Sequence, residues 1–309
     1  MSTGRVEFLD LARQYQAVKG EVDRALARVL ARGWYVLGEE VAGFEREFAA
    51  SLGVGHCVGV NSGTDALTLA LRACGVGPGD AVLTAANTAV PTVCAIVAAG
   101  ATPWLVDVDP VTLCLDPEAL RAELRNSGRP APARGRPGAP CTDTPPRWVR
   151  SLEIARTHGL WVVEDADAQR TARCTRGGPR GRSGDAGCFS FYPTKNLGAC
   201  GDAAAKVVVT NDPDLADCVV RLRNYGEEAK YRNRDRGVNS RLDELQAAAR
   251  GEAPAPREGL AGARPGPARL YDETLAGHAP ETPPRAAGLP AQPSPVRRPH
   301  ARPRRSARP

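Results

Sequence analysis

Lysine is scarce in this chain of 309 residues. Of its 41 lysine and arginine residues only four are lysines, namely Lys19, Lys195, Lys206 and Lys230. An amine can form a Schiff base with an aldehyde, whereas a guanidinium stays protonated at any working pH. Because arginine supplies nearly all the positive charge, an amine at Lys195, within the distinctive stretch 187–198, suggests that the chemistry there needs one.

Cysteine pairs and long apolar runs are also missing. The nine cysteines form no C-x-x-C pair and have no matching histidine cluster, which argues against a zinc site or a disulfide framework and favours reduced, mostly buried thiols. No run approaches the ~18 apolar residues of a membrane span, and no secretory signal precedes Val6. We therefore expect a cytoplasmic protein with no metal and no membrane partner.

Most of the chain lacks an excess of either charge, although the net charge is +6. Residues 250–309 contain 11 arginines and 5 acidic residues, so residues 1–249 hold 30 basic and 30 acidic side chains. The tail has no aromatic residue after Tyr271 on which bases could stack. Charge without stacking is weak support for nucleic-acid binding, and we predict none.

Helical and extended patterns alternate along the chain. Helical periodicity predicts helices over 21–31, from 41 up to 53, over 66–72 and over 92–99. Short apolar runs predict strands over 57–60, 81–84, 103–106, 161–163 and 188–191. Strands that alternate with helices indicate an α/β fold with a mostly parallel sheet, whose sites lie at the carboxyl ends of the strands.

A candidate anion site follows the predicted strand 57–60, where Ser62, Gly63 and Thr64 lead into a helix. The N–H groups of a first helical turn and the positive end of the helix dipole favour a phosphate. Gly63 lets the backbone approach a ligand closely, and Thr64 adds a hydroxyl group. The same pattern caps many ordinary helices, so a phosphate site and a plain helix cap both remain open.

Two other predicted strand ends carry reactive groups. Lys195 follows Pro193, which cannot donate to a ladder and so ends the strand 188–191. Asp165 follows the strand 161–163 and faces the same edge of the sheet. Each has a plain alternative, a structural lysine at a strand end and a helix N-cap. Taken with the anion site, they form the set that pyridoxal phosphate requires, because a carboxylate keeps the ring nitrogen protonated and an amine holds the aldehyde.

Six motifs resemble those of the DegT/DnrJ/EryC1/StrS family, the sugar aminotransferases that depend on pyridoxal phosphate. The motifs are Gly-Val-Asn-Ser-Gly-Thr-Asp-Ala-Leu (59–67), Gly-Ala-Thr-Pro-Trp-Leu-Val-Asp-Val-Asp-Pro (100–110), Val-Val-Glu-Asp-Ala (162–166), Gly-Asp-Ala-Gly-Cys-Phe-Ser-Phe-Tyr-Pro-Thr-Lys-Asn-Leu-Gly (184–198), Arg-Asn-Tyr-Gly (223–226) and Gly-Val-Asn-Ser-Arg-Leu-Asp-Glu-Leu-Gln-Ala-Ala (237–248). They occur in the family order, which makes the match far more specific than any lone short motif.

The resemblance implies a role for each matching residue. Lys195 corresponds to the lysine that forms the Schiff base with pyridoxal 5'-phosphate, and Asp165 corresponds to the partner of the pyridine nitrogen. Gly63, Thr64 and Ser190 correspond to the phosphate-binding residues. Relatives that dehydrate sugars carry histidine in place of this lysine, so Lys195 indicates amino transfer.

Three further positions complete the implied cofactor site. Asn239 corresponds to a residue that reaches the cofactor phosphate of the neighbouring subunit, which implies a homodimer. Gln169 is the counterpart, shifted by one position, of a glutamine that touches the ring oxygen of the cofactor. Ala89 lies where many relatives stack an aromatic residue on the ring.

The fold implied by the resemblance is that of aspartate aminotransferase, the PLP-dependent transferase fold type I. It predicts a large, mostly parallel α/β/α domain over residues 1–249 and an incomplete small C-terminal domain over residues 250–309. The implied reaction moves an amino group from glutamate or glutamine to a nucleotide-linked keto-deoxysugar.

Two segments depart from the family pattern. Residues 126–147 hold 6 prolines, 4 arginines and 3 glycines where relatives have a buried strand, and residues 250–309 have a similar composition. Reading-frame error or gene decay explains this pattern, and genuine disordered linkers are the alternative. We favour the first, because a linker does not replace a core strand. The chain is therefore predicted to be a poor enzyme, and its alternative function is that of a catalytically impaired or non-catalytic paralogue that keeps the cofactor fold.

Overall fold

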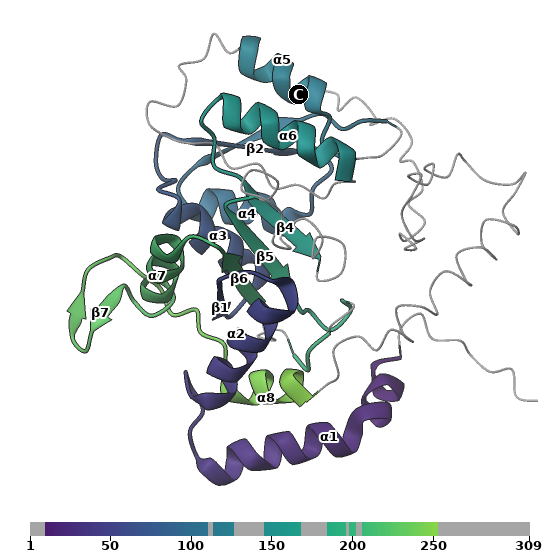
Figure 1. Cartoon of the computed structure of the whole chain (residues 1–309), viewed down its shortest axis with the longest axis vertical. Helices are drawn as coiled ribbons and strands as arrows, with labels where there is room; N and C mark the ends of the chain where they lie inside the picture. Colours follow the sequence, from purple (N-terminus) through teal and green to yellow (C-terminus); the bar gives the residue numbers. More distant parts are fainter. Residues whose placement is uncertain are drawn as a thin grey trace, which may run out of the picture. The chain divides into compact units, whose positions relative to one another are not determined.

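The computed structural model describes residues 10–110, 114–126, 145–167, 184–195, 198–201 and 206–252. The chain divides into a first unit of residues 1–109 and 114–255 and a second of residues 110–113 and 256–309. All the helices and strands described here belong to the first unit (Figure 1). The helices are α1 (Leu11–Arg32), α2 (Glu39–Leu52), α3 (Gly63–Ala73), α4 (Val90–Ala98), α5 (Pro117–Asn126), α6 (Pro145–Thr157), α7 (Pro213–Leu222) and α8 (Glu244–Glu252). The strands are β1 (His56–Val60), β2 (Ala81–Ala85), β3 (Thr102–Val106), β4 (Val163–Asp167), β5 (Ala186–Ser190), β6 (Lys206–Thr210), β7 (Glu227–Ala229) and β8 (Arg232–Asn233).

The main sheet has the strand order β1-β6-β5-β4, while β2 and β3 form a separate parallel pair. β6 runs antiparallel to both β1 and β5, and β5 runs parallel to β4. It follows that β1, β5 and β4 point in one direction and that β6 alone is reversed within this sheet. The predicted α/β fold is therefore confirmed, but among the described strands of the main sheet only β4 and β5 pair in parallel, because both ladders of β6 are antiparallel. Neither β6 nor its reversal was predicted, and the reversal brings the first residue of β6 to the edge where β1 and β5 end.

The two faces of the main sheet carry different apolar clusters. On one face α3 and α7 pack against alternate residues of the strands, including Cys188 and Val208. On the other face α2 and α8 cover the intervening residues, including Phe189. Phe44 and Phe48 of α2 meet Phe189 and Phe191 with ring centroids 5.3–5.7 Å apart. Because successive strand residues point to opposite faces, this alternation produces a sheet with helices on both sides.

The predicted boundaries fail around Asp165. The strand was expected to end at Val163 and to be followed by the acidic residues, but β4 begins at Val163 and runs to Asp167. Glu164 and Asp165 therefore lie inside the strand, and their placement after it was wrong. The physical reason is that pairing with β5, which starts at Ala186, sets the strand limits. The apolar residues just before Val163 are mostly buried, but they precede the strand.

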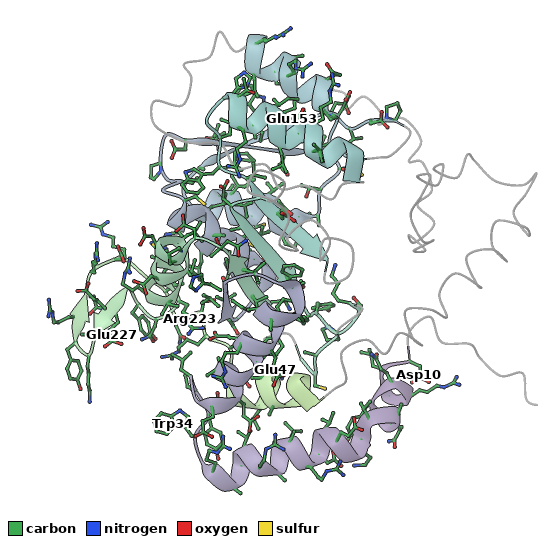
Figure 2. All side chains as sticks on the ribbon, viewed as in Figure 1. Asp10, Trp34, Glu47, Glu153, Arg223 and Glu227 are labelled. Carbon is green, nitrogen blue, oxygen red and sulfur yellow. The ribbon has the colours of Figure 1, made fainter. Side chains whose placement is uncertain are left out.

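A partly buried ion pair fixes the strand that leads to the proposed anion site. Nη1 of Arg223, labelled in Figure 2, donates to Oε1 of Glu45 at 2.5 Å and to the carbonyl of Gly59 at 2.8 Å. The N–H of Gly59 donates to the same Glu45 oxygen at 2.7 Å. A Cβ on Gly59 would lie 2.9 Å from Cδ2 of Leu242, so only glycine allows this close packing. These contacts among Glu45, Gly59 and Arg223 join α2, β1 and the residue that follows α7.

The domain assignment stays a prediction. The segment 126–147 and the tail 250–309 fall mainly on residues 127–144 and 253–309, which lie outside the described residues.

Candidate cofactor site

Neighbouring strand ends meet at one edge of the main sheet. β1 ends at Val60 and β5 ends at Ser190, while the reversed β6 starts at Lys206. In the strand register, Lys206 lies opposite Val60 on one side and opposite Ser190 on the other. The loop that carries Lys195 leaves β5 at this same edge. The predicted phosphate-binding and lysine-bearing segments are therefore neighbours in the fold.

Helix α3 begins at this edge, directly after the end of β1. Ser62 caps the helix, because its Oγ accepts the N–H of Asp65 at 3.0 Å. The N–H groups of Gly63 and Thr64 have no acceptor within an α-helix, so they can meet an anion. A Cβ built on Gly63 would lie 3.5 Å from Cβ and 3.6 Å from Oγ of Ser190, and would fill the space between the helix and β5. The structure thus brings Gly63, Thr64 and Ser190 together, and their role in phosphate binding stays a prediction.

Asp165 has a hydrogen-bonded support that the sequence reasoning missed. Thr92, 1% exposed, donates its Oγ1 to Oδ2 of Asp165 at 2.6 Å. The hydroxyl of Thr88 donates in turn to Thr92 at 3.1 Å. The N–H of Thr92 donates to the carbonyl of Ala89 at 3.0 Å, so Ala89 belongs to the same cluster. A threonine in the first turn of a helix after a strand is a weak signal, and its partner lies 73 residues away.

Lys195 lies in a tight turn after β5. Its N–H donates to the carbonyl of Tyr192 at 2.7 Å, and the N–H of Ala199 donates back to the carbonyl of Phe191 at 2.8 Å. A Cβ on Gly198 would collide with the carbonyl of Pro193, so glycine is required where the turn closes. These contacts hold Lys195 at the strand end, half-buried, as the sequence predicted.

Asn239 lies in a segment that is attached to the anion site. Its backbone forms a bridge with Asn224, and its side chain is exposed. The next residue, Ser240, is fully buried; its hydroxyl donates to Oδ2 of Asp65 at 2.8 Å and accepts the N–H of Asn61 at 3.1 Å. The segment is therefore fixed against the turn that opens α3. Its contact with a neighbouring subunit stays a prediction, and Gln169 lies outside the described residues.

Two buried titratable groups lie next to Asp165. Burial raises the pKa of Glu164 to about 7, while the N–H of Gly184 acts in the opposite direction. Burial also raises the pKa of the Cys188 thiol well above its usual range, and the charge of Asp165 adds to this effect. Cys188 is therefore a neutral thiol rather than a reactive thiolate. Neither group adds a nucleophile to the site.

Comparison with known proteins gives a family match over most of the chain. The model of the DegT/DnrJ/EryC1/StrS aminotransferase family matches residues 16–291. The chain is 45% identical over 250 residues to dTDP-3-amino-3,4,6-trideoxy-alpha-D-glucose transaminase of Streptomyces venezuelae, covering 80% of this chain and 63% of that protein. It is 37% identical over 246 residues to UDP-2-acetamido-2-deoxy-3-oxo-D-glucuronate aminotransferase of Pseudomonas aeruginosa, covering 79% and 66%. The chain thus spans less than two thirds of the length of these relatives.

Solved structures of the same family have the same fold. The Streptomyces venezuelae protein DesV, in complex with a ketimine intermediate, aligns with a TM-score of 0.77 and 41% identity, covering 92% of this chain and 75% of that one. A DegT DnrJ EryC1 StrS aminotransferase from Brucella abortus aligns with a TM-score of 0.78 and 33% identity, covering 92% and 76%. The predicted fold of the PLP-dependent transferases is confirmed by these alignments.

Proposed function

Because this chain belongs to the DegT/DnrJ/EryC1/StrS aminotransferase family, we propose that it moves an amino group from glutamate or glutamine to a nucleotide-linked keto-deoxysugar. The proposal is carried by one edge of the main sheet. There, Gly63 at the start of α3 lies beside Ser190, a pair that we call the cradle, and the turn with Lys195 follows β5. Asp165, hydrogen-bonded to Thr92, lies on the adjacent strand β4. Relatives named as dTDP-sugar and UDP-sugar transaminases support a nucleotide-linked acceptor. The family resemblance supports the amino donor.

The cofactor of this family, pyridoxal phosphate, fits the residues at this edge. The first turn of α3 lies close to the Ser190 hydroxyl, whose Oγ is 3.6 Å from the point where a Cβ on Gly63 would stand, so that both could donate to one phosphate. Thr64 would add a second hydroxyl to the phosphate. Asp165 and Ala89, joined through Thr92, would hold the ring. When bound, the cofactor withdraws electrons from the carbon that loses its proton. Gln169 remains the proposed contact to the ring oxygen.

Asp165 and Lys195 have different roles in the proposed reaction. The carboxylate of Asp165 stabilises a proton on the ring nitrogen, and the hydrogen bond from Thr92 to Oδ2 holds that carboxylate in one orientation. Nζ of Lys195 would take the proton from the alpha carbon of the amino donor, and it would supply a proton to the carbon of the ketosugar that receives the amino group. The tight turn around Lys195 limits the positions that the amine can sample.

The proposal is tested by replacing the amine. Purified protein supplied with pyridoxal phosphate should develop a visible absorbance band, and Lys195→Ala should lose this band together with amino transfer from glutamate to a nucleotide-linked ketosugar. Lys230→Ala, which removes an exposed amine from the turn between β7 and β8, is the matched control and should keep the band. An unchanged spectrum in Lys195→Ala would refute the assignment.

A homodimer and a cytoplasmic location belong to the same proposal. Asn239 is exposed beside the cradle, and Trp34, which Figure 2 labels, is 60% exposed after α1, as expected for groups that meet another subunit. The seven cysteines in the described ranges form no disulfide. Within the described ranges, none of the helices is both long and apolar enough to span a membrane.

The alternative function, a paralogue with little or no catalysis, is favoured by the composition of residues 126–147 and 250–309. Six prolines cannot donate to a sheet ladder, and four arginines cannot be buried without partners. We expect the chain to bind pyridoxal phosphate but to turn over slowly compared with a chain whose two segments are restored to the other reading frame. Equal amino-transfer rates in the two chains would show that these segments are genuine linkers.

A further inference from the structure

We infer that Lys206 supplies the buried cation for the phosphate of the cofactor, an inference that rests on the proposed function. Lys206 is 3% exposed and begins β6, whose other residues are three valines and one threonine, all buried. Lysine is rarely buried in a strand of this kind. No motif in the sequence assigned a role to this residue.

The location of Lys206 indicates which anion it serves. Its Cε lies 3.7 Å from the point where a Cβ on Gly63 would stand, and Oγ of Ser190 lies 3.6 Å from that same point. Its backbone is in register with Val60, which precedes the α3 turn, and with Ser190. Lys206 thus reaches the cradle from the sheet, while the α3 N–H groups reach it from the helix.

The electrostatics favour a doubly charged ligand at this point. The N-terminus of a helix contributes roughly half a positive charge, which does not balance a phosphate carrying about two negative charges. An ammonium is a compact point charge with three donors, and its attraction to an anion is stronger in a buried site than in water. The ring of Tyr192, whose centroid lies 5.8 Å from Nζ, covers the ammonium on one side. Lys206 is therefore placed to bind phosphate rather than the aldehyde end of the cofactor.

Paired titrations with pyridoxal phosphate and with pyridoxal, which lacks the phosphate, test this inference. Lys206→Met should weaken pyridoxal phosphate by about ten- to a hundredfold, the usual range for a lost charge-assisted hydrogen bond, and should leave pyridoxal nearly unchanged. Lys230→Met is the matched control, because its exposed ammonium also lies over a tyrosine ring, 5.4 Å from the centroid of Tyr231. Equal weakening of both ligands by Lys206→Met, or of neither, overturns the inference while the Lys195 band stands.

A second measurement does not require the Lys206 variant to fold. With only four lysines, selective isotope labelling at the ε carbon gives four signals, and those of Lys19, Lys195 and Lys230 can be assigned from their substitutions. Inorganic phosphate should shift the remaining signal, that of Lys206, and a signal that does not move overturns the inference. Failure of the wild-type protein to bind pyridoxal phosphate at all would instead overturn the proposed function, and the inference with it.

Discussion

A carboxylate from α8 caps a helix that lies about two hundred residues earlier in the sequence. The N-cap of α2 is Gly38, which has no side chain to accept the N–H groups of the first turn. Glu244, fully buried, accepts the N–H groups of Gly38 at 2.8 Å, Val41 at 2.9 Å and Glu40 at 3.0 Å. A Cβ on Gly38 would lie 2.7 Å from Oε2 of Glu244, so the carboxylate occupies the space that the glycine leaves.

Replacing Glu244 by alanine should therefore destabilise the fold strongly. Three N–H groups lose their acceptor, and each unsatisfied buried donor costs about 1–3 kcal/mol. The three share one carboxylate, so their losses do not add fully, while the lost negative charge at a helix N-terminus costs up to about 2 kcal/mol more. We expect the free energy of unfolding to fall by about 3–5 kcal/mol. Urea unfolding followed by circular dichroism measures this change.

The exposed carboxylate of the same helical turn provides the control. Glu39 is 84% exposed and lies 3.4 Å from Arg32, so Glu39→Ala should change the free energy of unfolding by less than about 0.5 kcal/mol. Glu244→Gln keeps one acceptor oxygen and removes the charge, and should give an intermediate loss. A loss below about 1 kcal/mol in Glu244→Ala would contradict the reasoning, because a capping role cannot be that small with three acceptor contacts removed.

Two further substitutions test the site and its pH dependence. Asp165→Asn keeps the acceptor for Thr92 but removes the charge, so pyridoxal phosphate should still bind while single-turnover proton removal slows by about 10²–10⁴; near-normal turnover would refute the electrostatic role. The pKa of Glu164 is raised from 4.5 to about 7 in the fold, so its contribution to stability is full below pH 4.5 and is lost as the pH rises through 7. Glu164→Gln should remove up to about 3 kcal/mol of this pH dependence, measured as the difference between the two proteins in urea unfolding at pH 5 and pH 8; parallel curves would contradict the pKa of Glu164.

Local signals were enough to predict the elements that form the cradle. The apolar run before Asn61 predicted β1, which ends at Val60 as expected, whereas the helix predicted from Ala66 begins three residues earlier, at Gly63. Pro193 predicted the end of β5 in the same way. These predictions succeeded because turn chemistry and capping act over a few residues.

The missed features depend on contacts between distant parts of the chain. The bond from Thr92 to Asp165 spans 73 residues, and that from Gly38 to Glu244 spans 206. No periodicity encodes such pairs. The direction of β6 was also beyond the sequence pattern, because an all-buried strand has no alternation that would indicate its neighbours. That direction determines which end of the strand, and so which side chain, reaches the site.

The division of the sheet has a consequence for catalysis. The cradle, Ser190 and the Lys195 turn are built on β1, β6 and β5, and these strands are joined by continuous ladders. Among the described strands, β4 pairs with β5 and has no second partner, and β2 and β3 pair with each other. Asp165 lies on β4 and depends for its orientation on Thr92 of α4, which follows β2. The proposed phosphate site would therefore be held by β1, β6 and β5, which are joined by continuous ladders, whereas the proposed ring-nitrogen contact would depend on the alignment of β4. A substitution that shifts β4 on the side away from β5 should then reduce turnover more than it reduces binding of the cofactor phosphate.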